Sequence, residues 1–175
     1  MDEKDYKQLL HLADLIQKKI SDVGFVPKAD SEDIMALYNK MVTNKILRDT
    51  TLQLFSEGHY ALAVEEAYKC LNNLVKSRTG LTADGADLMR NTFTPRNPVL
   101  ALNSLKTDSQ RDQQLGYMDI FAGCMTGIRN PRVHEHLYLD EPQVALEILS
   151  LANHLFRLVL NARRPRSRTR RMITP

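Results

Sequence analysis

The 175-residue chain has little cysteine, glycine or proline, no tryptophan and no long apolar run. Its two cysteines, Cys70 and Cys124, lie inside apolar helical patterns, and no CxxC pair or His/Cys cluster has the spacing of a zinc site. Buried structural thiols are therefore expected, rather than a disulfide framework or a metal centre. No apolar run approaches the ~20 residues of a spanning helix, and the N-terminus is acidic, unlike a signal peptide. We expect a cytoplasmic protein that does not bind membranes.

The remaining composition is that of one ordinary globular domain. Hydrophobic residues make up 43% and charged residues 26% of the chain, which is typical of a soluble fold. A chain of this length can bury one sizeable hydrophobic core and is too short for two domains of ordinary size.

Basic residues are concentrated at the C-terminus. Six of the 24 lysines and arginines, and none of the 21 acidic residues, lie in residues 162–175, so 18 basic and 21 acidic residues remain elsewhere. A basic end on a mildly acidic body is typical of a nucleic-acid contact, because arginines that neutralise phosphates release counterions. A solvated tail without a specific role is the alternative. The candidate RNA-binding residues are Arg163, Arg164, Arg166, Arg168, Arg170 and Arg171.

Apolar residues recur at helical spacing along almost the whole chain, without convincing alternation of period two. This pattern predicts an all-α, antiparallel helical bundle over residues 29–161. An N-terminal helix and connector over 1–28 are expected before it, and a basic, flexible tail over 162–175 after it. The predicted helices span about residues 2–22, 31–55, 59–78, 83–93, 110–129 and 140–161.

Three features bear on how these helices pack. Gly123 and Gly127 lie one turn apart, and each costs about 1 kcal/mol relative to alanine in a helix. We expect another helix to approach closely along their groove; the alternative is that Gly127 only loosens the last turn. The final helix is apolar around much of its circumference, which predicts that it is central or shared with a second subunit. Asp140, with Gln143 at the capping-box position, is expected to cap it.

The stretch GIRNPRVHEH, residues 127–136, forms a polar corner between the last two long helices. Because Pro131 disfavours helical geometry at Asn130, the fifth helix is expected to end at about Arg129. A tight turn there could bring Arg129 and His134 to the same side of the molecule. The arginine guanidinium is a forked cation and the histidine imidazole can carry a proton. Together they suit cleavage of RNA by attack of the 2′-OH on the adjacent phosphorus. The spacing alone also fits a structural interpretation, in which Arg129 neutralises a helix C-terminus, Asn130 ends the helix and His134 is an ordinary corner residue.

Arg129, Asn130 and His134, in the order Arg-Asn, three residues, His, resemble the signature of the HEPN superfamily. The wider sequence is similar to the Ymh-type family of small prokaryotic and phage proteins within that superfamily. The similar stretches, all within residues 54–136, are LFSEGHYALAVEEAYKCLNNLVKSRTGL, DGADLMRNTF and IFAGCMTGIRNPRVHEH.

The resemblance implies a helical bundle that dimerises so that two Arg/His corners face one composite cleft. It implies a metal-independent endoribonuclease without a cofactor, acting as a toxin or in antiviral defence and abortive infection. By the same resemblance Arg129 would bind the scissile phosphate, His134 would be the acid/base, and Asn130 would orient the cleft. The expected products are a 2′,3′-cyclic phosphate and a 5′-hydroxyl. The expected partners are RNA, a second copy of the chain, and an antitoxin or defence-system protein.

Two further sets of residues leave alternatives open. In HEPN toxins paired with nucleotidyltransferase antitoxins a tyrosine follows the histidine by two positions, whereas this chain has His136 there and Tyr138 further on. His136 is then an auxiliary proton carrier or a solvated loop histidine. The cleft could also be lined by Glu65, Glu66 and Lys69; the alternative is that they form the solvent-exposed face of their helix. The i,i+4 spacing of Glu65 and Lys69, which suits a surface ion pair, favours the solvent-exposed face. The competing function is a non-catalytic helical dimer that binds nucleic acid, nucleotide or a protein.

Overall fold

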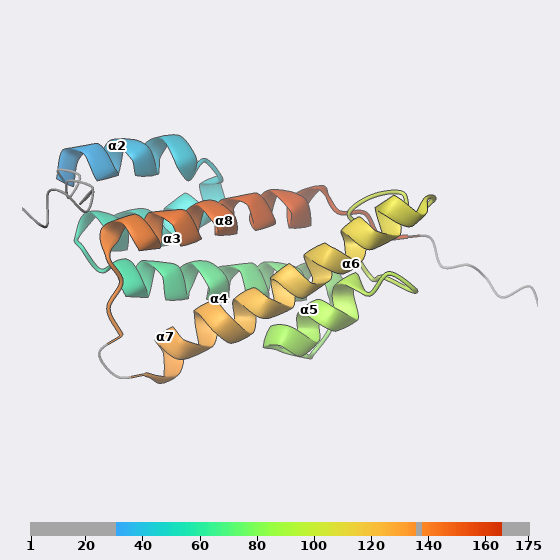
Figure 1. Ribbon diagram of the computed structural model, residues 1–175. Helices are drawn as coiled ribbons and strands as arrows, with labels where there is room; N and C mark the ends of the chain where they lie inside the picture. The colour runs from blue at the N-terminus through green and yellow to red at the C-terminus, as the bar shows by residue number, and fades with distance from the viewer. Residues whose placement is uncertain (1–30, 136–137, 166–175) are drawn as a thin grey trace, which may run out of the picture. The chain divides into compact units, whose positions relative to one another are not determined.

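The computed structural model describes residues 31–135 and 138–165, which form helices joined by short connections (Figure 1). The predicted all-α bundle is confirmed, and the N-terminal segment 1–28 lies outside the described residues. The helices are α2 (Ser31–Met41), α3 (Lys45–Ser56), α4 (Tyr60–Thr79), α5 (Gly85–Phe93), α6 (Asp108–Gly123), the π-helix η1 (Cys124–Arg129), α7 (Asn130–His134) and α8 (Pro142–Asn161).

Helix α4 is the element on which most of the others pack, since it contacts α3, α5, η1, α7 and α8 (Figure 1). Helices α4 and α8 run parallel. The Tyr68 hydroxyl donates to the Ile148 carbonyl, and ten residues further along α4 the Arg78 guanidinium donates to the Leu160 carbonyl. The antiparallel prediction is wrong for this pair, because α6, η1 and α7 carry the chain back along α4 before α8 begins.

The core is apolar and well connected by aromatic side chains. The rings of Phe93 and Phe121 stack at 4.5 Å and join α5 to α6, and those of Tyr38 and Phe55 stack at 4.7 Å and join α2 to α3. Helix α8 is long and apolar enough to suit a membrane span, but here its apolar face is buried in the bundle. Its buried residues are Ala145, Leu146, Leu149, Ala152, Leu155, Phe156 and Val159.

The single helix predicted over 31–55 is two helices. Asn44 is the N-cap of α3, and its side-chain oxygen accepts from the Leu47 backbone N–H at 3.2 Å. The Asn153 side chain of α8 accepts from the backbone N–H groups of Thr43 and Asn44 at 3.0 and 2.8 Å. The apolar spacing continues through this point, so it predicted one helix. The break is favourable because the free backbone N–H groups of Thr43 and Asn44 bind Asn153, which lies 109 or more positions away in the sequence.

The helix predicted to end at Arg129 continues to His134. Asn130 has helical dihedral angles (φ −61°, ψ −43°), and its N–H bonds to the Met125 carbonyl five residues back. In an α-helix the ring of Pro131 would clash with the carbonyl of residue 127. The wider π-turn of η1 directly precedes Pro131 and relieves this conflict, so the proline changes the helix geometry without ending the helix.

The expected helix partner of Gly123 and Gly127 is not present among the described residues. A Cβ atom added at either position meets no atom within 4 Å, and both residues are exposed. Close helix approach within one chain therefore does not explain these glycines.

The open surroundings of Gly123 predict that Gly123→Ala stabilises the protein by up to about 1 kcal/mol, since Gly123 has helical dihedrals (φ −60°, ψ −40°). Urea unfolding measures the change. Gly80→Ala is the matched control: Gly80 is also free of neighbours but has φ 75°, so it should lose stability. A loss at Gly123 would contradict the open environment of this helix face.

The chain remains anchored beyond α8. Ala101 and Arg163 exchange both backbone hydrogen bonds, at 2.8 and 2.9 Å. The Arg164 guanidinium donates to the Arg78 carbonyl, and Arg78 donates to the Ala162 carbonyl at 2.9 Å. The first residues of the predicted tail, 162–164, are thus anchored: the backbone groups of Ala162 and Arg163 and the Arg164 side chain bind α4 and the α5–α6 loop. Arg166, Arg168, Arg170 and Arg171 lie outside the described residues.

Candidate functional site

The two arginines of the polar corner have different environments, and Arg132 is the structural one. Its Nε and Nη2 donate to the two Asp140 carboxylate oxygens at 2.7 and 2.6 Å, and its Nη1 donates to the Ile128 carbonyl at 2.7 Å. The two charged side chains are only 3% and 4% exposed. The guanidinium also lies 4.7 Å from the Tyr138 ring centroid. Every part of this side chain is used to hold the loop between α7 and α8.

This ion pair corrects the prediction for the start of α8. Asp140 binds Arg132 and does not cap the helix; the N-cap is Glu141, which makes no side-chain capping bond. The sequence pattern was misleading because a buried cation eight residues earlier is a stronger partner for the carboxylate than a backbone N–H.

Arg129 is only loosely held. Its Nη1 lies 3.4 Å from Asp84 Oδ2, and its Nε is buried without a hydrogen-bond partner among the described residues. The side chain is 21% exposed. Since a guanidinium has five N–H donors in a rigid fork, most of its donor capacity is not used by the residues that the structure describes. An oxyanion placed beside it could take up that capacity.

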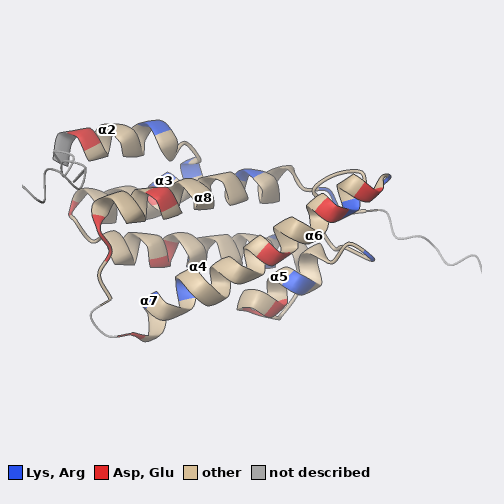
Figure 2. Cartoon of the chain, in the orientation of Figure 1, with Lys and Arg blue, Asp and Glu red and all other residues tan. Residues whose placement is uncertain are grey.

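Asp84 is the common partner of the polar side chains near Arg129. It precedes α5 and lies beside α4, where Lys76 Nζ is 2.7 Å and Asn72 Nδ2 is 2.8 Å from Asp84 Oδ1. The buried Asn72 also accepts from the Gly85 N–H at 3.0 Å, which fixes the start of α5. The three charged residues Lys76, Asp84 and Arg129 leave the cluster with one net positive charge, and Figure 2 shows the basic positions of η1 and α7 at the end of α6.

The cations beside Asp84 lower its pKa below the ordinary value, chiefly through the hydrogen bond from Lys76 and then through Asn72 and the charge of Arg129, against the opposing effect of burial. A depressed pKa stabilises the fold above the unfolded value near 4 and loses this effect as the pH falls through the folded value.

Asp84→Asn should therefore be less stable than the parent at pH 6, by under about 1 kcal/mol because the carboxylate is 49% exposed. The difference should be smaller at pH 3, because the unfolded parent is then largely protonated and the advantage of the folded carboxylate is being lost. Urea unfolding at the two pH values measures it. A difference that stays constant between pH 6 and pH 3 would contradict the ionic role of Asp84.

His134 and Asn130 lie at opposite ends of α7, one turn apart, and so face the same side. His134 is exposed, and it makes no side-chain hydrogen bond to a described residue. No contact joins it to Arg129 among the described residues. The structure thus places the Asn130 and His134 side chains together and does not pair Arg129 with His134 within one chain. His136 lies outside the described residues.

Other candidate groups have structural roles. Lys69 Nζ lies 2.5 Å from Glu65 and 2.9 Å from Glu66, which confirms the i,i+4 pair predicted for Glu65 and Lys69. Burial raises the pKa of the Cys124 thiol, and burial together with Cys124 raises that of Tyr68. Neither group is a ready nucleophile at neutral pH, because its charged form is disfavoured.

Comparison with known proteins assigns the chain to one protein family. Residues 42–159 match a protein family described as "Protein of unknown function (Hypoth_ymh)". The chain belongs to this family. The matched Hypoth_ymh region contains the cluster of Asn72, Lys76, Asp84 and Arg129 as well as α7 with His134, and it ends within α8. No curated protein and no solved structure matches the sequence.

Three residues of the Hypoth_ymh site were missed by sequence reasoning. Asn72, Lys76 and Asp84 are ordinary polar residues on helical or loop patterns, and nothing in their spacing links them to Arg129. One signal was available, because the similar stretch DGADLMRNTF begins at Asp84. An Asp-Gly pair at the start of a helix is also a common capping pattern. The pattern therefore did not indicate that Asp84 contacts Arg129.

Proposed function

We propose that the protein is a metal-independent endoribonuclease of the HEPN type, acting as a toxin or antiviral-defence effector. The observation that carries the proposal is the contrast between the two corner arginines. Arg132 is saturated and buried, whereas Arg129 makes one ion pair, at 3.4 Å to Asp84, and its Nε has no hydrogen-bond partner among the described residues. An arginine with a single weak ion pair among the described residues, in a cluster of net positive charge, suits a phosphodiester better than it suits fold stability.

The proposed chemistry uses only the RNA and these side chains. The 2′-oxygen forms a bond to the adjacent phosphorus, and the bond from phosphorus to the 5′-oxygen breaks. His134 serves as acid/base for the proton that leaves the 2′-OH or the proton that the departing 5′-oxygen gains. Arg129 stabilises the added negative charge on the phosphoryl oxygens, and Asn130 orients the strand beside His134. The products are a 2′,3′-cyclic phosphate and a 5′-hydroxyl.

A second copy of the chain is part of the proposal. Within one copy Arg129 contacts Asp84, while His134 is exposed and makes no side-chain hydrogen bond to a described residue. Two corners facing one cleft would supply an arginine from one subunit and a histidine from the other. A homodimer with a composite site therefore accounts for the separation of the two side chains.

The deciding assay is cleavage of labelled RNA by the purified protein in EDTA, with a substrate that carries a single 2′-deoxy nucleotide at the cut site. Cutting in EDTA that the deoxy substitution blocks is the expected result. RNA that stays intact under all conditions would overturn the proposal.

Intact RNA would instead favour a non-catalytic helical dimer that binds nucleic acid, nucleotide or a protein. One observation favours this alternative: His134 has no described partner that orients its ring, whereas catalytic histidines are commonly held by a second group.

The basic C-terminus supports RNA as the substrate. The Arg164 guanidinium binds the Arg78 carbonyl, two residues along α4 from Lys76 of the Asp84 cluster. The six arginines of residues 162–175 add positive charge through which the protein could bind an RNA backbone outside the proposed site.

Deleting residues 166–175 removes four arginines but keeps the anchored residues Arg163 and Arg164. We expect weaker RNA binding, with a salt dependence that flattens by roughly 0.7 in log–log slope for each arginine that contacts a phosphate, and residual cleavage. Fluorescence anisotropy across salt concentrations measures the slope. Arg111→Ala, an exposed arginine on α6, is the control and should leave the slope unchanged. An unchanged slope after the deletion would assign the tail no role in binding.

A further inference from the structure

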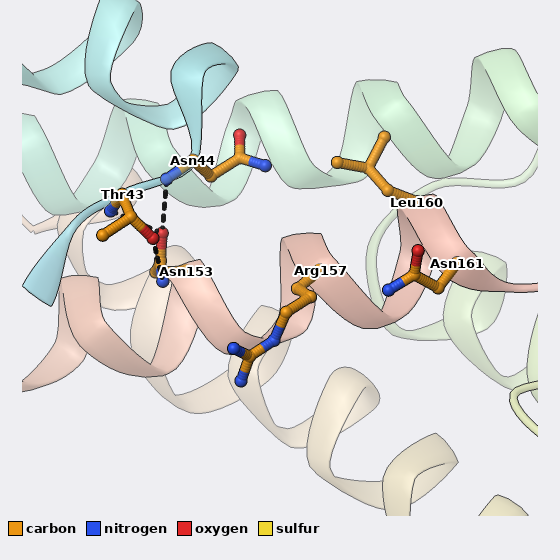
Figure 3. A pocket seen from close by; sticks show the side chains of 6 residues that line it. All are labelled: Thr43, Asn44, Asn153, Arg157, Leu160 and Asn161. Carbon is orange, nitrogen blue, oxygen red and sulfur yellow. Dashed lines mark hydrogen bonds between the residues drawn. The ribbon is translucent and has the colours of Figure 1, made fainter.

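A second polar site lies on the other face of α8, away from the Arg129 cluster. A hollow of about 150 Å³ opens between the α2–α3 connection and the second half of α8 (Figure 3). Five of its six lining residues are polar, and none is acidic. The lining consists of Thr43, Asn44, Asn153, Arg157, Leu160 and Asn161.

Two of the oxygen acceptors of this hollow are already used by the fold. Asn153 Oδ1 accepts from two backbone N–H groups, and Asn44 Oδ1 accepts from the Leu47 N–H at 3.2 Å. The nitrogen of each carboxamide is thereby turned away from the backbone, and Asn153 Nδ2 has only a 3.4 Å contact to the Thr43 hydroxyl. The side chains of Asn44 and Asn161 project into the hollow from opposite sides (Figure 3). The hollow therefore presents amide N–H donors from Asn44, Asn153 and Asn161, beside the Asn161 amide oxygen and Leu160.

Arg157 adds a positive charge that no described carboxylate neutralises. Its Nη2 lies 3.2 Å from His154 Nδ1, and His154 Nε2 lies 2.8 Å from the Tyr117 hydroxyl. Because a guanidinium can only donate, this hydrogen-bond network requires Nδ1 to accept and Nε2 to carry the proton. Tyr117 and His154 thus hold one edge of the guanidinium, which points away from Asn44 and Asn161 in this conformation (Figure 3), and its remaining N–H groups make no hydrogen bond to a described residue.

We propose that this hollow binds a phosphate group, carried by a small molecule or by an RNA strand. A forked cation with amide donors and no acid complements a tetrahedral oxyanion. The volume is below the ~300–1,000 Å³ of sites that enclose a drug-sized ligand, so only the phosphate enters and the rest of its carrier lies outside. The proposal does not depend on the ribonuclease activity.

The test is a titration followed by the side-chain amide NMR signals of Asn44 and Asn161 in the full-length protein. The probes are inorganic phosphate, adenosine 5′-monophosphate and a short RNA, the last in a His134→Ala background so that it remains uncut. We expect saturable shifts with at least one probe. Tightest binding of the mononucleotide would indicate a small-molecule carrier, and tightest binding of the RNA would indicate the strand.

Arg157→Ala should weaken the tightest of these interactions at least about tenfold, since a charge-assisted contact is lost. The matched control is Arg90→Ala, an exposed arginine on α5 that should bind like the parent. Both variants keep the C-terminal arginines, and thermal unfolding checks that both are folded. Absence of saturable shifts with all three probes, or equal weakening by the two substitutions, would overturn the proposal.

Discussion

Replacing His134 by alanine is expected to lower the rate of RNA cleavage in EDTA by a factor of about 10²–10⁴, the usual contribution of a general acid/base. Stability should hardly change, because His134 is exposed at the end of α7 and makes no side-chain hydrogen bond to a described residue. Single-turnover cleavage of labelled RNA measures the first effect, and thermal unfolding measures the second.

His59 provides the matched control. It is also exposed, and its only ion-pair contact among the described residues is to Glu57 at 3.9 Å. His59→Ala should cut RNA as the parent does. Parental cleavage by His134→Ala, with its fold intact, would remove His134 from the mechanism and leave Arg129 without its proposed partner.

Mixing two inactive variants tests the composite site. Arg129→Ala and His134→Ala should each be inactive alone. In a mixed dimer one subunit retains the arginine and the other retains the histidine, so one intact pair can form if the two residues act across the interface. Partial recovery of cleavage on mixing is expected. No recovery, although the subunits exchange, would mean that both residues must act from the same chain.

The second large effect concerns stability. Arg132→Ala is expected to destabilise the fold by about 3–5 kcal/mol, because it leaves the Asp140 carboxylate buried and unpaired. The Ile128 carbonyl also loses its donor, and Tyr138 loses the cation against its ring. Urea unfolding monitored by circular dichroism gives the free energy of unfolding.

Two comparisons make this prediction specific. Arg129→Ala removes an arginine only three positions away but should cost under about 1 kcal/mol, since its single ion pair is 3.4 Å long and half exposed on the Asp84 side. Replacing Arg132 and Asp140 together by leucine should recover much of the loss, because no unpaired charge then remains. Equal costs for Arg129→Ala and Arg132→Ala would contradict the distinction on which the proposed function rests.

Apolar periodicity was sufficient to predict most helices. The segment predicted over 59–78 is α4, Tyr60–Thr79, and it ends at Gly80 in the left-handed conformation that glycine favours. The segment predicted over 83–93 is α5, and the two prolines after it lie in a loop as expected. These elements depend on the spacing of apolar side chains and on the backbone preferences of glycine and proline. Both are local properties that can be read directly from the sequence.

The failures occur where a distant residue overrides a local preference. The break between α2 and α3 depends on Asn153, and the start of α8 depends on the pairing of Asp140 with Arg132. At Pro131 the backbone widens into a π-turn within a helix that packs on α4 and α5, which costs less than ending the helix there and exposing its apolar face.

By itself, the sequence determined the all-α class, the positions of the main helices, and the presence of an arginine, an asparagine and a histidine in one short corner. The resemblance singled out Arg129, but composition and spacing could not show that Arg132, in the same polar stretch, has a structural role. The tertiary structure decided that question: residues from α4 and the start of α5 surround Arg129, whereas Asp140 and a main-chain carbonyl saturate Arg132. The neighbours that each arginine meets are set by the packing of the helices rather than by composition.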